Sequence, residues 1–217
     1  MTITASLVKD LREKTGAGMM DCKKALTESN GDIEKAIEFL RKKGLKSLDK
    51  RASKVAAEGF IGMYLHAGGQ VGAIVELNCE TDFVARGDDF KETANSLAMH
   101  VCAMNPQFLN REEVPDSFIE KEKEIILETL NENQKKMADK IIDGKIDKIY
   151  GENVFLEQGF IKDDSGKLSV NDVIGELSIK CGEKVTIRRF VKFTVGEGIE
   201  KEEVDFASEV ASTISGV

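Results

Sequence analysis

The spacing of apolar residues changes abruptly after the first quarter of the chain, and this change limits the folds open to it. Within residues 33–40, apolar side chains follow the three-to-four-residue period of an amphipathic helix. Over residues 61–65 and 71–77 they alternate one by one, and Gly68 and Gly69 lie between these segments. Two alternating segments joined by a glycine pair are typical of a β-hairpin. The sequence therefore predicts an α+β fold, with a helical N-terminal part followed by antiparallel strands.

Residues 3–44 are predicted to form three short helices. The first ends at Thr15-Gly16, and the second extends from Met19 to Ser29. Asp32 suits the N-cap of the third helix and Gly44 suits its C-cap. Helices of this length bury only a small core, so we expect attachment or a partner to help hold the bundle together.

The rest of the chain combines further helices with one more strand. Ser117 and Glu120 form a possible capping box at a helix start, and residues 134–150 and 170–180 have helical spacing. Residues 154–161 are predicted to be extended. The last strand is marked by apolar residues at even spacing, namely Val185, Ile187, Val191 and Phe193.

These elements divide the chain into four segments. They are a three-helix domain at 1–45, a helical linker at 46–57, an α+β core with antiparallel strands and surrounding helices at 58–195, and a helical tail at 196–217. The tail is predicted to be helical because apolar residues recur at helical spacing between Val204 and Ile214.

Charge is unevenly distributed over the 217 residues, whose net charge is −8. Residues 1–54 hold 13 Lys and Arg against 8 Asp and Glu, so the remainder is strongly acidic. An acidic body argues against direct nucleic-acid binding. The basic front segment either meets an acidic partner or is simply a solvated helical surface. No apolar run reaches the ~20 residues of a membrane span, and residues 1–6 lack a signal-peptide pattern, so we expect a cytoplasmic protein.

Residues for chemistry are sparse. The sequence has no phosphate-binding glycine loop after a strand, no nucleophile elbow and no zinc-protease motif. Its four cysteines are scattered without metal-ligand spacing, which favours buried thiols and leaves a disulfide between subunits open. Of the two histidines, His66 is expected near the hairpin turn and His100 in a structural position on a helix. We therefore expect no enzyme activity, no cofactor and no bound metal.

One aromatic residue stands out after the hairpin. Phe83 lies between Asp82 and Val84 in a polar stretch that follows residues 72–79. Such a ring either projects into another protein or plugs the core of its own hairpin. The two alternatives differ in the effect of Phe83→Ala, which would weaken binding in the first case and cost a few kcal/mol of stability in the second.

Two long runs resemble the signatures of the bacterial translation elongation factor Ts family. They are LVKDLREKTGAGMMDCKKAL at residues 7–26 and ELNCETDFVAR at residues 76–86. Shorter matches occur at 97–100 and 196–201, and the resemblance covers essentially the whole chain.

The resemblance implies a guanine-nucleotide exchange factor for elongation factor Tu, a GTPase. It also implies that the front bundle is a ubiquitin-associated-like domain. The implied contacts fall into three groups. They are Thr81, Asp82, Phe83 and Val84 against the GTPase domain near its magnesium ion, Arg12, Met19 and Met20 on the front domain, and, less specifically, His66 and Phe206.

Chain length indicates which members of the family are most similar. The sequence has room for one clear hairpin before the Phe83 loop, as in short members whose two chains associate. We therefore expect a homodimer. A different hypothesis is a non-catalytic adaptor that binds ubiquitin-like or nascent-chain partners through its front bundle.

Overall fold

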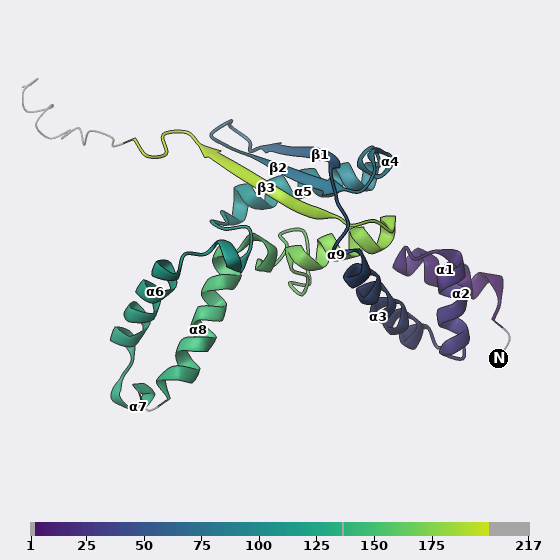
Figure 1. The fold of residues 1–217 in the computed structure, drawn as a ribbon, viewed down its shortest axis with the longest axis horizontal. Coiled ribbons are helices and arrows are strands. Elements are labelled where there is room, and N and C mark those ends of the chain that lie inside the picture. The colour runs from purple at the N-terminus through teal and green to yellow at the C-terminus, as the bar shows by residue number, and fades with distance from the viewer. Residues whose placement is uncertain (1–2, 136, 200–217) are drawn as a thin grey trace, which may run out of the picture.

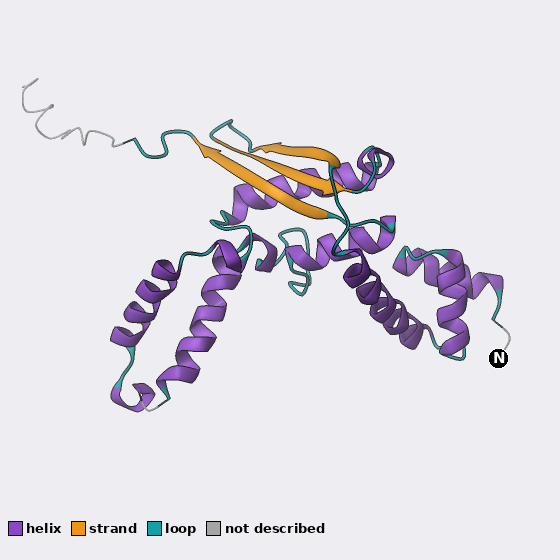
Figure 2. Ribbon diagram, viewed as in Figure 1, coloured by secondary structure: helices purple, strands orange, loops and turns teal. Residues whose placement is uncertain are grey.

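The structure, a computed structural model, describes residues 3–135 and 137–199, without the side chains of residues 45–50 and 132. The chain forms a small sheet with helices packed beside it, as Figures 1 and 2 show. The elements in chain order are α1 (Ala5–Thr15), α2 (Met19–Glu28), α3 (Ile33–Arg51), β1 (Glu58–Leu65), β2 (Val71–Cys79), α4 (Asp82–Ala85), α5 (Asp88–Met104), η1 (Arg111–Glu113), α6 (Asp116–Thr129), α7 (Glu132–Lys135), α8 (Ala138–Asn153), η2 (Phe155–Glu157), α9 (Val170–Cys181) and β3 (Thr186–Thr194). This arrangement confirms the α+β class.

Within the described residues, the sheet has three antiparallel strands in the order β1-β2-β3. The predicted hairpin is confirmed, because β1 and β2 pair along their whole length. At the turn, Gly68 and Gly69 have positive φ angles of 92° and 68°, a conformation that glycine adopts without strain. The long connection from β2 to β3 contains α4 to α9, so the third strand arrives from over 100 residues away.

Helix α5 packs on one face of the sheet and forms the main core. Phe90, Ala94 and Leu97 of this helix are buried against Val75 of the central strand. The helix comes so close to β1 that a Cβ atom on Gly62 would lie 2.3 Å from backbone atoms of Ala94. A larger residue at Gly62 would therefore push the helix away from the sheet.

The N-terminal bundle has a separate core, formed by residues of α1, α2 and α3 that include Leu11 and Leu26. The predicted N-cap is confirmed, since the Asp32 side chain accepts a hydrogen bond from the Lys35 amide at 3.1 Å. The prediction that Gly44 ends the third helix is wrong, because α3 continues to Arg51. The glycine serves close packing, since a Cβ atom there would lie 2.4 Å from Cδ1 of Ile179 on α9.

A pair of long helices, α6 and α8, extends from the core away from the N-terminal bundle (Figure 1). The predicted capping box at Ser117 and Glu120 is wrong, because α6 starts at Asp116 directly after Pro115. The helix predicted at 134–150 is divided into α7 and α8. Residues 154–161 are not a strand but contain the short helix η2, whereas the helix predicted at 170–180 is confirmed as α9.

The last strand is confirmed as β3, but its apolar residues divide between two faces. The β2–β3 register shifts between Glu76 and Leu77, where the ladder skips Arg188. An extra residue of this kind reverses the side to which the following residues point. Ile187 is therefore buried in the core, whereas Val191 is 41% exposed on the opposite face.

The predicted helical tail and Phe206 lie outside the described residues. Among the helices that are described, none combines the length and the apolar character that crossing a membrane requires.

His100 is buried on α5, as expected of a structural histidine. Its Nε2 atom lies 2.9 Å from Oε1 of Gln158, and its Nδ1 atom accepts the amide N–H of Ile161 at 3.1 Å. These partners fit a neutral ring that is protonated on Nε2. Burial lowers the pKa of His100 below its usual value of 6.5, although the hydrogen bond to Gln158 opposes part of this shift.

Because the pKa of His100 is lowered in the folded protein, we predict that mild acidification reduces stability. Below about pH 6.5 the unfolded chain binds a proton at His100 that the folded chain still excludes, so the free energy of unfolding falls as the pH decreases. Denaturant unfolding between pH 7.5 and 5.5 measures this slope. We expect His100→Gln, which cannot titrate, to flatten it. An equally steep slope in that variant would contradict the assignment.

Candidate functional site

Phe83 projects from the short helix α4, directly after the central strand. Its side chain is 85% exposed, the largest exposed fraction among the large apolar residues of the described chain. This exposure excludes the alternative that the ring plugs the hairpin core. The neighbouring Val84 instead packs against the core, and Ala85 is buried. The loop is thus attached through one side and presents an aromatic ring on the other.

Thr81 begins α4, and a distant carboxylate holds it. Its hydroxyl oxygen accepts a hydrogen bond from the Val84 amide at 3.4 Å, as an N-cap does. The same hydroxyl donates to Oε1 of Glu183 at 2.6 Å, and the Thr81 amide donates to Oε2 of Glu183 at 3.0 Å. Sequence reasoning missed Glu183, because no local pattern signals a partner 102 positions away.

Asp82 is exposed and pairs with Arg86 four residues later, at 2.8 Å between Oδ2 and Nη2. An exposed pair of this kind contributes little to stability. The carboxylate of Asp82 can therefore exchange its partner for groups on another protein at small cost.

Cys79, the last residue of β2, forms a hydrogen bond to the loop that follows it. Its thiol donates to the carbonyl oxygen of Thr81 at 3.1 Å. Burial, with the nearby charge of Glu183, raises the pKa of Cys79 to about 11, so the thiol stays protonated at neutral pH. The four cysteines are all free thiols in the structure.

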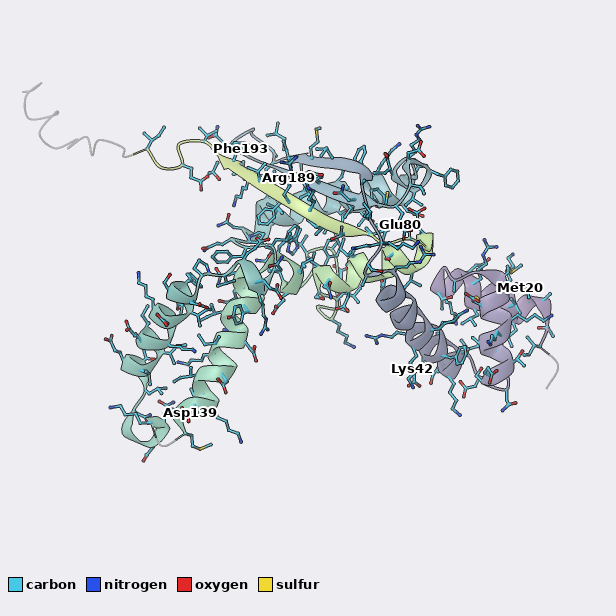
Figure 3. The ribbon with its side chains drawn as sticks, in the orientation of Figure 1. Met20, Lys42, Glu80, Asp139, Arg189 and Phe193 are labelled. Carbon is cyan, nitrogen blue, oxygen red and sulfur yellow. The ribbon has the colours of Figure 1, made fainter. Side chains whose placement is uncertain are left out.

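The predicted residues of the N-terminal bundle also lie on its surface. Met19 and Met20 occupy the first turn of α2 and are 51% and 75% exposed. Arg12, on α1, is exposed as well. Gly16 ends α1 in the left-handed conformation and donates its amide to the carbonyl of Arg12 at 2.7 Å, which fixes the turn between these helices. Figure 3 shows Met20 on the outer side of the bundle.

His66 lies at the hairpin turn, at the opposite end of β1 from α4 (Figure 1). The ring is exposed, and its Nδ1 atom lies 3.3 Å from the hydroxyl oxygen of Tyr64. The structure therefore does not bring His66 together with the Phe83 loop.

The sheet has a second, open face that the sequence analysis did not identify. Cross-strand partners point to the same side of a sheet, and the register aligns Met63 with Ile74 and Val191 in one row. Leu65, Gly72 and Phe193 form the next row. The large apolar residues of this open sheet face are 39–69% exposed, and they are Ile61, Met63, Leu65, Ile74, Val191 and Phe193. Alternation in the sequence revealed the strands but not which side the core covers.

Over the described part of the chain, no group of three or more His, Cys, Asp or Glu side chains is arranged to hold a metal ion. The described surfaces are instead apolar side chains with charged neighbours, which is the composition of a protein-binding surface.

Comparison with known proteins agrees with this description. The family model "Elongation factor TS" matches residues 2–197. The elongation factor Ts of Desulforamulus reducens is 55% identical over 214 residues, which cover 98% of each chain. The elongation factors Ts of Syntrophomonas wolfei and Geobacter sulfurreducens are 54% and 50% identical, again over 98% of this chain. The chain belongs to the elongation factor Ts family, translation elongation factors whose known role is nucleotide exchange.

Proposed function

We propose that this protein binds the GDP-bound form of elongation factor Tu, and that Phe83 enters the partner near its magnesium and phosphate site. The single observation that carries this proposal is the exposed ring of Phe83 on a firmly attached loop. Membership of the family supports the nucleotide-exchange role, and the exposure of Phe83 supports its assignment to this side chain.

Nucleotide exchange in this proposal requires no covalent step. A GTPase holds GDP through backbone amides on the phosphates and through a magnesium ion bound by oxygen ligands. A protein that binds the nucleotide-free state more tightly weakens GDP binding by the same factor. Burial of one Phe side chain in the partner contributes roughly 1.5–3 kcal/mol, enough to accelerate release about tenfold or more. The chain therefore acts by binding, and we expect it to act in the cytoplasm, where translation takes place.

The loop is suited to this role because its parts have separate functions. Val84 and Ala85 attach it to the core, Thr81 starts its helix, and Phe83 is left free. Asp82 is placed to accept hydrogen bonds from backbone amides of the partner or to repel its phosphates. The adaptor hypothesis would use the N-terminal bundle but gives no role to the exposed ring.

We propose that Arg12, Met19 and Met20 form a second contact that strengthens binding, and that His66 and Phe206 contribute further contacts. Exposed Met side chains adapt to irregular surfaces. They lie on a different element from Phe83, so their loss should affect affinity rather than the rate of GDP release within the complex.

The open sheet face supports the expected homodimer. Its two apolar rows leave a shallow groove between the β1–β2 turn and the end of β3. Covering such a surface with the same face of a second chain removes it from water and joins two sheets face to face. We propose that two copies associate through this face.

Phe83→Ala tests the proposed function directly. We expect the maximal rate of GDP release from elongation factor Tu to fall about tenfold or more, because the variant lacks the ring that disturbs the nucleotide site. Since the ring is exposed, the free energy of unfolding should change by less than about 0.5 kcal/mol. Stopped-flow release of a fluorescent GDP measures the rate, and Met104→Ala, at the far end of α5, is the control. An unchanged rate would rule out the role of Phe83.

Met20→Ser tests the second contact. The concentration of this protein that gives half-maximal exchange should rise about five- to tenfold, corresponding to roughly 1 kcal/mol of lost contact, and the maximal rate should stay the same. The same stopped-flow titration separates these two quantities. A lower maximal rate at unchanged half-saturation would show that Met20 acts on the nucleotide site instead.

Met63→Glu tests the homodimer. A carboxylate in the centre of the open sheet face would be desolvated on association, so the variant should have the mass of one chain. Met137→Glu is the matched control, because Met137 is 60% exposed and Met63 66%, but Met137 lies at the start of α8. Light scattering after gel filtration should give twice the mass of one chain for the unmodified protein and for this control. A dimeric Met63→Glu would place the interface elsewhere.

A further inference from the structure

We propose that Glu183 is a positioning residue for nucleotide exchange, and that Glu183 and Glu80 together hold the Phe83 loop in its active orientation. This inference rests on the proposed function and concerns how the same site is supported. The Glu80–Glu183 pair joins the end of β2 to the segment between α9 and β3.

The Glu80–Glu183 pair connects the two segments just beyond the end of the β2–β3 ladder. The last residues aligned between β2 and β3 are Asn78 and Thr186, and beyond them the two segments leave the ladder. Oε2 of Glu183 accepts the backbone amide of Glu80 at 3.1 Å. In return, Oε1 of Glu80 accepts the backbone amide of Lys184 at 2.7 Å. Two carboxylates thus replace the carbonyl groups that would continue a β-ladder.

The contacts of Glu183 fix the first residue of the loop. Glu183 binds both the amide and the hydroxyl of Thr81, at 3.0 Å and 2.6 Å, and Thr81 is the N-cap of α4. Hydrogen bonds to a charged acceptor are stronger than bonds between neutral groups. Because both the amide and the hydroxyl of Thr81 are held, the direction in which α4 begins is defined. Phe83 lies two residues after Thr81.

Helix α4 depends on this external support. It has only four residues, and a single helical turn does not hold its own shape in water. The exposed ring of Phe83 gains little packing from its own chain. Loss of the Glu183 contacts would therefore leave the ring attached but free to point in several directions, and ordering it on binding would then cost free energy.

The same junction holds the end of the N-terminal bundle. Nη1 of Arg51, the last residue of α3, lies 2.8 Å from Oε1 of Glu80. The Lys184 ammonium group donates to the carbonyl oxygens of Ala52 and Lys54, at 2.7 Å and 3.1 Å. Figure 3 shows Glu80 where the sheet, α9 and α3 meet. The bonds from Lys184 and Arg51 lower the pKa of Glu80, so it remains charged at neutral pH.

The Glu80–Glu183 pair therefore connects the Phe83 loop to the N-terminal bundle, the two proposed contact surfaces. Phe83 is oriented by Glu183, and the bundle that carries Met20 is anchored through Arg51 to Glu80. A residue with this role affects exchange through Phe83, whereas a merely structural residue would affect it through the fraction of folded protein.

Glu183→Ala tests the inference in the full-length chain, with fluorescent GDP on elongation factor Tu as the probe. We expect the maximal rate of release to fall about tenfold while the melting temperature shows the protein to be folded under assay conditions. Glu183→Gln should restore most of the rate, because its amide oxygen still accepts the two backbone amides. Glu176→Ala removes an exposed carboxylate of α9 and is the matched control, with an unchanged rate.

Combining Glu183→Ala with Phe83→Ala shows whether Glu183 acts through the ring. The double variant should be no slower than Phe83→Ala alone, because a ring that is absent cannot be misdirected. Amide hydrogen exchange of the free Glu183→Ala protein should accelerate at Thr81, while β2 stays protected.

Three results would overturn the inference. They are a wild-type rate of GDP release for Glu183→Ala, a rate reduced by the same factor in the Phe83→Ala background, and a reduction of the rate that only follows the unfolded fraction.

If Glu183→Ala does not fold, Glu183→Asp replaces it, since this variant keeps the charge and withdraws the carboxylate by one methylene. A wild-type rate for folded Glu183→Asp with altered Thr81 exchange would equally contradict the inference. If the unmodified protein did not accelerate GDP release from elongation factor Tu, the proposed function itself would be refuted. The two failures are therefore distinguishable.

Discussion

Two carboxylates at the end of the β2–β3 ladder hold together the Phe83 loop, the segment before β3 and the end of α3. Glu183 and Glu80 each accept a backbone amide from the segment that carries the other, so the connection between the strands continues where regular pairing stops. The loop with Phe83 begins on one side of this junction, and α3 ends on the other. Because charged acceptors form strong hydrogen bonds, a short loop can have a defined direction without a core of its own. The contacts at the end of the sheet, rather than the four-residue helix α4, therefore set the direction of the loop that carries Phe83.

In the described part of the chain, several large apolar side chains are exposed to solvent. One face of the sheet is filled by α5, while the other presents two rows of apolar side chains to solvent. Phe83 and Met20 add isolated apolar groups at other places. Contiguous apolar surface on a folded chain marks contact with another protein, which agrees with a family that acts by binding a GTPase. The two surfaces differ in shape, since the open sheet face is an extended surface of several side chains whereas Phe83 is a single projecting side chain.

Sequence patterns predicted the elements better than their relations. The hairpin, the third helix with its Asp32 cap and the helix at 170–180 were recognised because their periods and caps are local properties. Gly44 was misread as a helix end, because a glycine that permits close packing against Ile179 looks the same in sequence as a C-cap. The bulge at Arg188 was also missed, since an extra residue in one strand is defined only by its partner strand. The predicted site residues of the described chain are exposed except Val84, which is half-buried against the core. Glu183, which holds Thr81, was not among the predicted residues.

The sequence by itself determined the α+β class, the family and the identity of the exposed aromatic residue, because periodicity and signature runs are written along the chain. Only the tertiary structure decided that Phe83 points outward, which face of the sheet stays open, and that Glu183 holds Thr81. These features depend on contacts between residues about 100 positions apart and on which side of a strand a helix covers. The pattern of one strand is the same whichever of its faces is buried, so burial is settled only when the helix and the third strand are in place.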